Sequence, residues 1–537
     1  MREYPLTLAP YFKVGLRAEY RSERNRPGFV TLKNLEASPN GLVAYEPLSL
    51  VAPEDLMLGF GLGIEWPWPK LHHGRNFTTI FARNSVYNVH WQTGNITRLD
   101  TYDFFDQDNF LTIAPGGPWS VADMGNGWIA VNGSSIVFHD NLKNAQGLPD
   151  RVFVTTPTPA DLSIFPLPIT CCGFKGRYLM GGFVNHFLTE GMIDMLETDA
   201  DMTAKGLSSA REVIDSFTDN TVWWSSIGGG DLYTILSHAK ATGGYVGATE
   251  YGTASFKYIY DLWRKNEMGF ASMEWQGFVR SLVASKEYAV AYGDNGVTAF
   301  HTMLEPMSTL GTKTMLPIGI VSAGAAASDK DDQIFMDAEG ELWHINSNLE
   351  MNKLGYKEHF KTFLGTDVTI CYEPSRRRFF IGNGFRQFSL GRNGLYETTQ
   401  VVTSAAYIRR PVICGANPFL LIRDWNVLTD TFDMGNRGIK RVAFVDLTGE
   451  LDGTIQGRFH YRYQSGSDTD WLQSEWIYAF DNHIAANVEG IEFRLELKGA
   501  DFTNVRLENA SIRWQQSDKR FVRGAYQTQA LAAPPNE

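Results

Sequence analysis

Cysteine is scarce in this chain, with four in 537 residues. Cys171 and Cys172 are adjacent, whereas Cys371 and Cys414 stand alone. Structural zinc sites use cysteines at short, fixed spacings, and disulfide frameworks need many more of them. The sequence therefore predicts neither kind of crosslink, and we expect four buried free thiols.

An excess of basic residues is also lacking. The chain has 48 Lys and Arg against 60 Asp and Glu, a formal net charge of -12. Proteins that grip nucleic acid neutralise phosphates with clustered Lys and Arg. The charge balance therefore argues against a surface that binds nucleic acid tightly. It suits the wall of a channel through which DNA slides, because acidic groups repel phosphate.

Long apolar runs are missing as well. The longest, around Leu316–Ala327, contains Pro and Gly and is shorter than the roughly 18 to 20 residues that span a bilayer. Met1–Pro10 has no apolar segment typical of a secretory signal. We therefore expect no membrane-spanning segment and synthesis in the cytoplasm.

Familiar catalytic motifs do not occur. The sequence has no phosphate-binding loop, no nucleophile elbow and no zinc-protease helix motif. Gly59–Gly63 superficially resembles a nucleotide loop, but it runs into Trp66–Pro69 rather than into a helix. His72 and His73 are adjacent, so on a strand they would point to opposite faces. We expect no catalytic residue, no cofactor and no metal site, and hence a protein that is not an enzyme.

Glycine and aromatic residues are plentiful, at 51 Gly and 13% Phe, Trp and Tyr. From about residue 76 to 400, short apolar strands alternate with Gly-containing turns such as Asp294–Gly296 and Asp337–Gly340. Asn-Gly and Asp-Xaa-Gly sequences favour hairpin tips. Several tips lie about 30 to 65 residues apart, which brackets the roughly 40 to 50 residues of a propeller blade. The pattern predicts a β-propeller of about seven blades, with six or eight also possible.

Two segments break this pattern. Ala204–Phe217 and Phe256–Asn266 have helical spacing of apolar residues; in the second, Phe256, Tyr260 and Trp263 fall on one helix face. We expect short helical insertions between blades.

The C-terminal part alternates more regularly. In Phe459–Tyr463 the aromatic and charged residues occupy alternate positions, and Ile491–Lys498 alternates strictly. Such a period indicates strands with one buried and one solvated face, as in a β-sandwich. We thus predict an all-β chain with four parts: an N-terminal β lead segment (1–60), a β-propeller (61–414), a C-terminal β-sandwich (415–525) and a flexible tail (526–537). Whether the lead segment completes a blade or joins the sandwich stays open.

Two phrases resemble a known group of proteins. Gly28–Leu35, followed by Pro39–Leu42 and Glu46–Leu48, resembles the opening of the propeller-containing tail hub and nozzle proteins of tailed bacteriophages, especially short-tailed ones. Thr429–Lys440, together with Val488–Leu495, is similar to the sandwich that closes such proteins.

The resemblance implies a structural protein of the virion. It implies a tail ring of about six copies, placed below the portal and adaptor, that forms or closes the DNA exit channel and supports fibres or a tip protein. DNA would pass without sequence-specific binding. Synthesis would take place in the host cytoplasm. No catalytic residue carries over.

Two sets of residues are candidates for function. Asp329, Asp331 and Asp332 form an acidic loop that could face the DNA lumen, although a solvated loop tip is the simpler interpretation. The alternative function is a carbohydrate-binding or glycoside-hydrolysing propeller, in which Trp471 and Trp476 would stack on sugars unless they pack in the core.

Overall fold

The computed structural model describes part of the chain and divides it into two compact units. Unit 1 comprises residues 1–46, 393–398 and 421–537, and unit 2 comprises 47–392 and 399–420. The described residues are 2–6, 16, 28–38, 41–45, 49–50, 70–73, 77–82, 84–90, 96–103, 110, 112–123, 127–140, 151–155, 167–184, 190–207, 209–211, 218–228, 257, 260–265, 267–303, 310–408, 410–414, 424–436, 438–464, 470–500 and 505–517. The loop at 59–63 and the predicted tail at 526–537 lie outside them.

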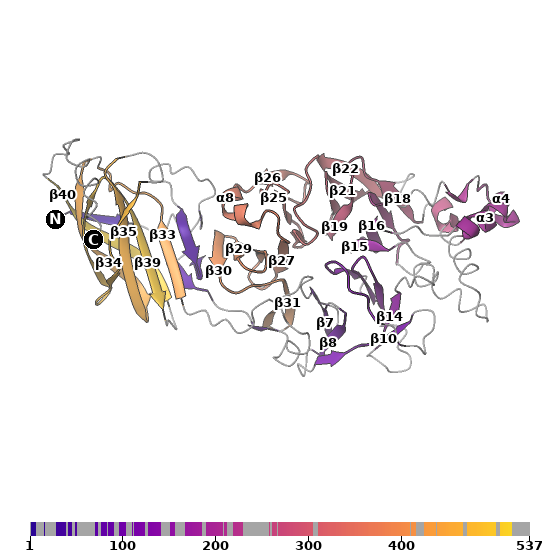
Figure 1. The fold of residues 1–537 in the computed structure, drawn as a ribbon, viewed down its shortest axis with the longest axis horizontal. Coiled ribbons are helices and arrows are strands. Elements are labelled where there is room, and N and C mark those ends of the chain that lie inside the picture. The colour runs from indigo at the N-terminus through magenta and orange to yellow at the C-terminus, as the bar shows by residue number, and fades with distance from the viewer. Residues whose placement is uncertain are drawn as a thin grey trace, which may run out of the picture. The chain divides into compact units, whose positions relative to one another are not determined.

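Unit 2 is a β-propeller whose described strands fall into seven groups, which we call blades 1 to 7. Figure 1 shows the blades following one another around a common centre. Blades 1 to 3 contain β6 (Lys70–His73), β7 (Phe77–Phe81), β8 (Val86–His90) and β9 (Ile96–Arg98); β10 (Asp100–Asp103), β11 (Ser120–Asp123), β12 (Gly127–Val131), β13 (Ile136–Asp140) and β14 (Arg151–Thr155); and β15 (Pro168–Phe174), β16 (Arg177–Phe183), β17 (Thr221–Trp224) and β18 (Gly269–Ser272).

The remaining blades follow in chain order, and the last closes the circle. Blade 7 takes two strands from the end of the propeller segment and one from its beginning, because β32 pairs with β5. Blades 4 to 7 contain β19 (Val279–Ala284), β20 (Ala289–Gly293), β21 (Val297–Thr302) and β22 (Leu310–Leu316); β23 (Ala326–Ser328), β24 (Gln333–Met336), β25 (Leu342–Ile345) and β26 (Met351–Lys353); β27 (Thr369–Glu373), β28 (Arg378–Gly382) and β29 (Gln387–Gly391); and β31 (Ser404–Ile408), β32 (Arg410–Cys414) and β5 (Ser49–Leu50).

Hydrogen bonds tie each blade to the next. Most of them join the inner strands, which are β6, β11, β15, β19, β23, β27 and β31, so the blades support one another around the axis. The bonds are His72 Nε2 with Asp123 Oδ2 (2.9 Å), Ser120 Oγ to Cys171 O (2.7 Å), Leu282 N to Thr170 Oγ1 (2.8 Å), Gln333 Nε2 to Val283 O (3.1 Å), Ile370 N to Gly324 O (2.8 Å), Val402 N to Gln387 Oε1 (3.1 Å) and Leu71 N to Ser404 Oγ (2.9 Å).

Short helices accompany blade 3 and blade 6. α3 (Glu190–Thr198) and α4 (Ala200–Ala204) follow β16, and their buried Ile193, Leu196 and Met202 pack in one cluster with strand residues of blades 2 and 3. The predicted helix at 256–266 is helical at 257 and 260–264, whereas the first helical insertion starts before the predicted 204–217. Further along lie α8 (Lys357–Phe360) and the 3-10 helix η1 (Lys361–Phe363).

Unit 1 is a sandwich of two sheets. The N-terminal strands belong to it, because β1 and β4 pair with β40 and β2 pairs with β33. The propeller segment is therefore inserted between strands of the sandwich. One sheet contains β1 (Arg2–Leu6), β3 (Leu35–Ser38), β4 (Gly41–Ala44), β34 (Lys440–Leu451), β38 (His483–Gly490) and β40 (Val505–Gln516); the other contains β2 (Phe29–Lys33), β30 (Gly394–Thr398), β33 (Asp424–Thr429), β35 (Thr454–Arg462), β36 (Leu472–Gln473), β37 (Ile477–Tyr478) and β39 (Glu492–Ala500).

The two sheets of unit 1 approach each other closely at Gly457. A Cβ on this β35 residue would come within 2.6 Å of Ile484 Cδ1 on β38, so glycine lets the two layers meet. β38 buries every second residue, which is typical of a strand with one dry face. The predicted fold class, all-β with a propeller, a sandwich and short helices, is confirmed.

Candidate functional site: the axial cavity of the propeller

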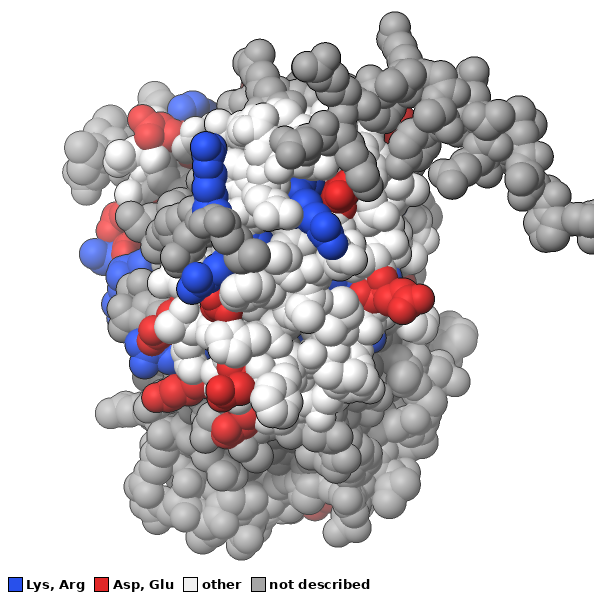
Figure 2. Space-filling model, turned by 90° about the vertical axis from the view of Figure 1, so that its left-hand side faces the viewer, with Lys and Arg blue, Asp and Glu red and all other residues white. Residues whose placement is uncertain are grey.

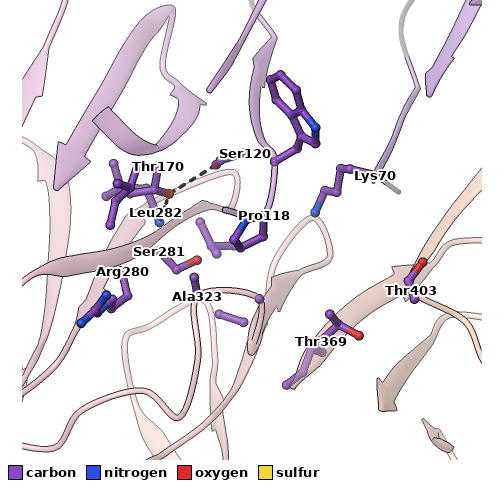
Figure 3. A pocket seen from close by; sticks show the side chains of 16 residues that line it. Lys70, Pro118, Ser120, Thr170, Arg280, Ser281, Leu282, Ala323, Thr369 and Thr403 are labelled. Carbon is purple, nitrogen blue, oxygen red and sulfur yellow. Dashed lines mark hydrogen bonds between the residues drawn. The ribbon is translucent and has the colours of Figure 1, made fainter. Parts of the chain in front are cut away.

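All seven inner strands converge on one small cavity in unit 2. Its volume is about 90 Å³. The wall residues stand at or just before the beginning of the inner strands, because these strands start at the same end of the propeller (Figure 3). They are Lys70, Pro118, Trp119, Ser120, Ile169, Thr170, Arg280, Ser281, Leu282, Val283, Ala323, Gly324, Ala326, Thr369, Ile370 and Thr403.

Lys70 is the distinctive residue of this wall. Figure 3 shows its amine pointing into the cavity from the first residue of β6. Burial lowers the pKa of Lys70, and the thiols of Cys371 and Cys171 offset this only in part. Among the described residues, none forms a hydrogen bond or ion pair with the Lys70 amine, and the described wall contains no carboxylate.

The second cation of the wall, Arg280, is already paired. Its Nε lies 2.6 Å from Asp294 Oδ1, and Asp294 Oδ2 also accepts the Phe278 N–H at 2.9 Å. Asp294 thus holds the turn and neutralises Arg280, which is a structural role. Lys70 is left as the uncompensated charge.

Hydroxyl groups supply the remaining polarity. Thr170 Oγ1 accepts the Leu282 N–H and lies 3.3 Å from Ser120 Oγ. Ser281 is buried, and within the described part of the chain its hydroxyl has no hydrogen-bond partner. Figure 3 shows this hydroxyl directed toward the interior of the cavity. The wall therefore offers hydrogen-bond donors and one unpaired positive charge.

The acidic loop lies elsewhere. Asp329, Asp331 and Asp332 follow the C-terminal end of β23, whereas the cavity residues of this blade precede or begin that strand. Asp329 Oδ1 accepts the backbone N–H groups of Asp331 (2.8 Å) and Asp332 (2.7 Å), and Asp332 lies 3.2 Å from His344 Nε2. The loop is thus an ordered turn, and none of its acids belongs to the cavity wall.

Trp471 and Trp476 lie on a charged face of unit 1. The Arg462 and Arg494 guanidinium groups lie 4.5 and 4.2 Å from the ring centroid of Trp471. The Arg458 guanidinium and the Lys498 amine lie 4.4 and 3.9 Å from that of Trp476. Both indoles are half-buried and engaged by cations of β35 and β39 rather than lying open.

Buried ion pairs lie beneath these indoles. Arg462 Nη2 is 2.5 Å from Glu492 Oε2, and Glu496 lies 2.6 Å from both Arg458 and His460. Asn426 also donates to Glu496 at 3.0 Å. Burial by itself would raise the pKa of Glu496, but these hydrogen bonds and the Arg458 charge lower it to about 2. We name Arg458, His460, Arg462, Glu492, Arg494, Glu496 and Lys498 the charged sandwich face.

Three further observations concern predictions made from the sequence. Cys171, Cys172 and Cys371 are buried free thiols, as predicted; the Cys414 side chain lies outside the described set. No group of three or more His, Cys, Asp or Glu with a metal-binding arrangement occurs among the described residues. None of the helices in the described ranges is long and apolar enough to cross a membrane.

Sequence reasoning missed Lys70. The sequence marks it only as a lysine at the start of a short strand before two histidines. Its position in the cavity depends on strands that are spread over residues 70 to 403 and come together only in the folded propeller. No local sequence pattern predicts this arrangement.

Comparisons with known proteins give distant structural likeness only. No family model and no curated protein matches the chain. A solved structure of PorZ, a bacterial surface component of the type-IX secretion system of Porphyromonas gingivalis, matches with a TM-score of 0.31 and 10% identity over 67% of this chain, which spans 35% of that one. The extracellular domain of the hybrid two-component system BT4673 of B. thetaiotaomicron matches with a TM-score of 0.34 and 9% identity over 95% of this chain and 58% of that one. Human WBSCR16 matches with a TM-score of 0.28 and 10% identity over 75% of this chain and 94% of that one.

Proposed function

We propose that this chain is a non-catalytic structural subunit of a bacteriophage tail. In this proposal, about six copies form a ring below the portal and adaptor, line or close the DNA exit channel, and support fibres or a tip protein. The protein acts through surfaces that meet its neighbours, so its site is an interface.

The axial cavity is the observation that carries the proposal. Its accessible space is about 90 Å³, which suits small molecules or ions rather than a macromolecule. Duplex DNA, whose major groove alone is about 12 Å wide, cannot enter it. A DNA channel would therefore have to lie between copies of the chain, as a ring provides.

The cavity wall also favours a structural role over glycoside hydrolysis. A glycosidase needs two carboxyl groups about 5 to 10 Å apart around its substrate. The described wall residues include no Asp or Glu. Glycan stacking on Trp471 and Trp476 is likewise disfavoured, because cations already occupy positions over both rings.

The phrases that resemble phage tail proteins both contribute to unit 1. Phe29, Leu32 and Leu35 of the first phrase are fully buried. In the second phrase Phe432 is buried and bridges to Phe493, next to the turn at Met434 and Gly435 where the backbone has positive φ values of 53° and 71°. These residues determine how the sandwich folds, so the resemblance bears on architecture.

The distribution of surface charge is compatible with DNA that passes along the protein without being held. Figure 2 shows acidic and basic side chains interspersed, with a largely uncharged middle. That face carries no continuous basic stripe among its described residues, which a phosphate-gripping surface would need.

The decisive experiment measures mass in solution by light scattering over a concentration series, with and without portal and adaptor proteins. We expect a discrete ring of about six copies, formed by the chain alone or after the partners are added. A monomer that ignores those partners would contradict the proposal. Screening the same sample for glycan hydrolysis would then test the carbohydrate alternative.

A further inference from the structure

We infer that the axial cavity binds a small oxyanion of the phosphate class, held by the Lys70 ammonium and the Ser281 hydroxyl. The inference does not rest on the tail assignment, because it concerns the interior of one propeller. Its two ligands come from blade 1 and blade 4, so a bound anion would also link blades across the axis.

The first argument is charge. Removing an ammonium group from water without a counter-charge is unfavourable, and Lys70 is half-buried in the cavity wall. Arg280 is neutralised by Asp294, but no carboxylate belongs to the described wall beside Lys70. An anion in the cavity would supply the missing charge and would favour the protonated form of the amine, whose pKa burial lowers.

The second argument is hydrogen bonding. The Ser281 oxygen is accessible from the cavity rather than sealed in the interior. Ser281 is only 7% exposed, points into the cavity, and has no partner within the described chain. An oxyanion has several acceptor oxygens and can take the Ser281 proton and a Lys70 proton together, and charge-assisted bonds of this kind are strong.

The third argument is size. A cavity with about 90 Å³ of accessible space has room for a compact ion. Together with the unpaired Lys70 amine and the hydroxyl donors of the wall, this favours an inorganic oxyanion as the ligand class.

The test is a titration of the full chain with inorganic phosphate, followed by calorimetry and thermal unfolding. Chloride at matched ionic strength controls for general salt effects. We expect saturable heat and a saturable rise in Tm for the wild type. Lys70→Met should weaken phosphate binding about tenfold or more, and Ser281→Ala by a smaller factor. Lys286→Met, at a lysine whose side chain is 71% exposed, should leave binding unchanged.

The outcomes separate cleanly. No saturable response in the wild type overturns the inference, and so does a Lys70→Met protein that responds like the wild type. If Lys70→Met fails to fold, Lys70→Arg and Ser281→Ala take its place: the first should retain phosphate binding and the second should lose part of it. Equal binding by the wild type and Ser281→Ala would overturn the role of the hydroxyl. A monomeric chain that binds phosphate would leave this inference standing while the ring proposal fails.

Discussion

Glu496 on β39 lies 2.6 Å from His460 on β35, and both side chains are buried. Arg458 approaches the same Glu496 oxygen at 2.6 Å. One carboxylate thus holds two neighbouring basic groups on a sheet face that sequence alternation alone would assign to solvent.

Acid should destabilise the sandwich through this carboxylate. The pKa of Glu496 is lowered from 4.5 to about 2 in the folded state, so its stabilisation is complete above pH 4.5 and is lost as the pH falls toward 2. The shift corresponds to about 3 kcal/mol. Urea unfolding followed by Trp fluorescence at pH 7, 4.5 and 3 should show this loss.

Glu496→Gln is the matched variant for that prediction. At pH 7 it should lower the free energy of unfolding by about 3 kcal/mol, because Arg458 loses its counter-charge. It should also flatten the pH dependence below 4.5. Glu475→Gln, at an exposed position, should do neither. A pH profile identical in wild type and Glu496→Gln would contradict the prediction.

The contact between the Trp476 indole and the Lys498 ammonium should contribute measurably to the stability of unit 1. Lys498 Nζ lies 3.9 Å from the ring centroid of Trp476. A double-mutant cycle with Trp476→Leu and Lys498→Met should give a coupling energy of about 0.5 to 1 kcal/mol. Additive single effects would mean that the ring and the ammonium do not interact in solution. A glycan array would test the alternative role, and we expect no signal that Trp476→Leu removes.

A side chain at Gly457 should force Ile484 to shift and should destabilise the sandwich modestly. A Cβ at this position meets Ile484 Cδ1 at 2.6 Å, and overpacking of this kind costs about 1 to 3 kcal/mol. Gly457→Ala should therefore destabilise the sandwich. The same substitution should cost less in an Ile484→Ala protein than in the wild type, because the Ile484 Cδ1 atom is then absent. Gly391→Ala is the control, because the nearest atom to its new Cβ lies 3.9 Å away. Equal free energies of unfolding for Gly457→Ala and Gly391→Ala would contradict this prediction, because they would mean that the two sheets separate without cost to make room for the new Cβ.

The hairpins were predictable because their determinants are local. Turn sequences such as Asp294–Gly296 and Asp337–Gly340 set the backbone angles and side-chain caps of β20–β21 and β24–β25 within a few residues. The alternation in Ile491–Lys498 likewise predicted a strand. It did not predict that Glu492, Arg494 and Glu496 are buried, because their cover comes from Trp471 and Trp476 on a separate segment.

The pairing of strands that are far apart in the chain could not be predicted from the sequence for the same reason. β1 pairs with β40, with Arg2 opposite Trp514, and nothing near either strand encodes that choice. The candidate site has the same origin: Lys70 and Ser281 line one cavity only because seven inner strands share one axis. Local patterns therefore identified the elements and the fold class, while the cavity and the charged sandwich face required the structure.

Thr170 should stabilise the ring of blades. It is buried, and its Oγ1 accepts the Leu282 N–H of the next blade at 2.8 Å. Thr170→Val keeps the shape but leaves that backbone donor unsatisfied, at a cost of about 1 to 3 kcal/mol. Thr302→Val, at an exposed position, should cost little. Differential scanning calorimetry should show a lower Tm for the first variant only; equal values would mean that the interblade bond contributes nothing.

Charge on the acidic loop can be removed without removing its turn. Asp329 Oδ1 accepts two backbone N–H groups, and an asparagine oxygen can accept them as well. The triple variant Asp329→Asn, Asp331→Asn, Asp332→Asn should therefore keep the free energy of unfolding within about 0.5 kcal/mol of the wild type. Asp329→Ala, which loses the acceptor, should be less stable than the triple variant.

The triple variant tests whether that loop faces DNA. If it borders the lumen of a tail ring, neutral side chains should let phosphate linger, so genome release should slow while ring mass by light scattering stays the same. The effect should shrink at high salt, because screening weakens the repulsion that the acids provide. Release at the wild-type rate from intact rings would mean that Asp329, Asp331 and Asp332 lie away from the DNA path.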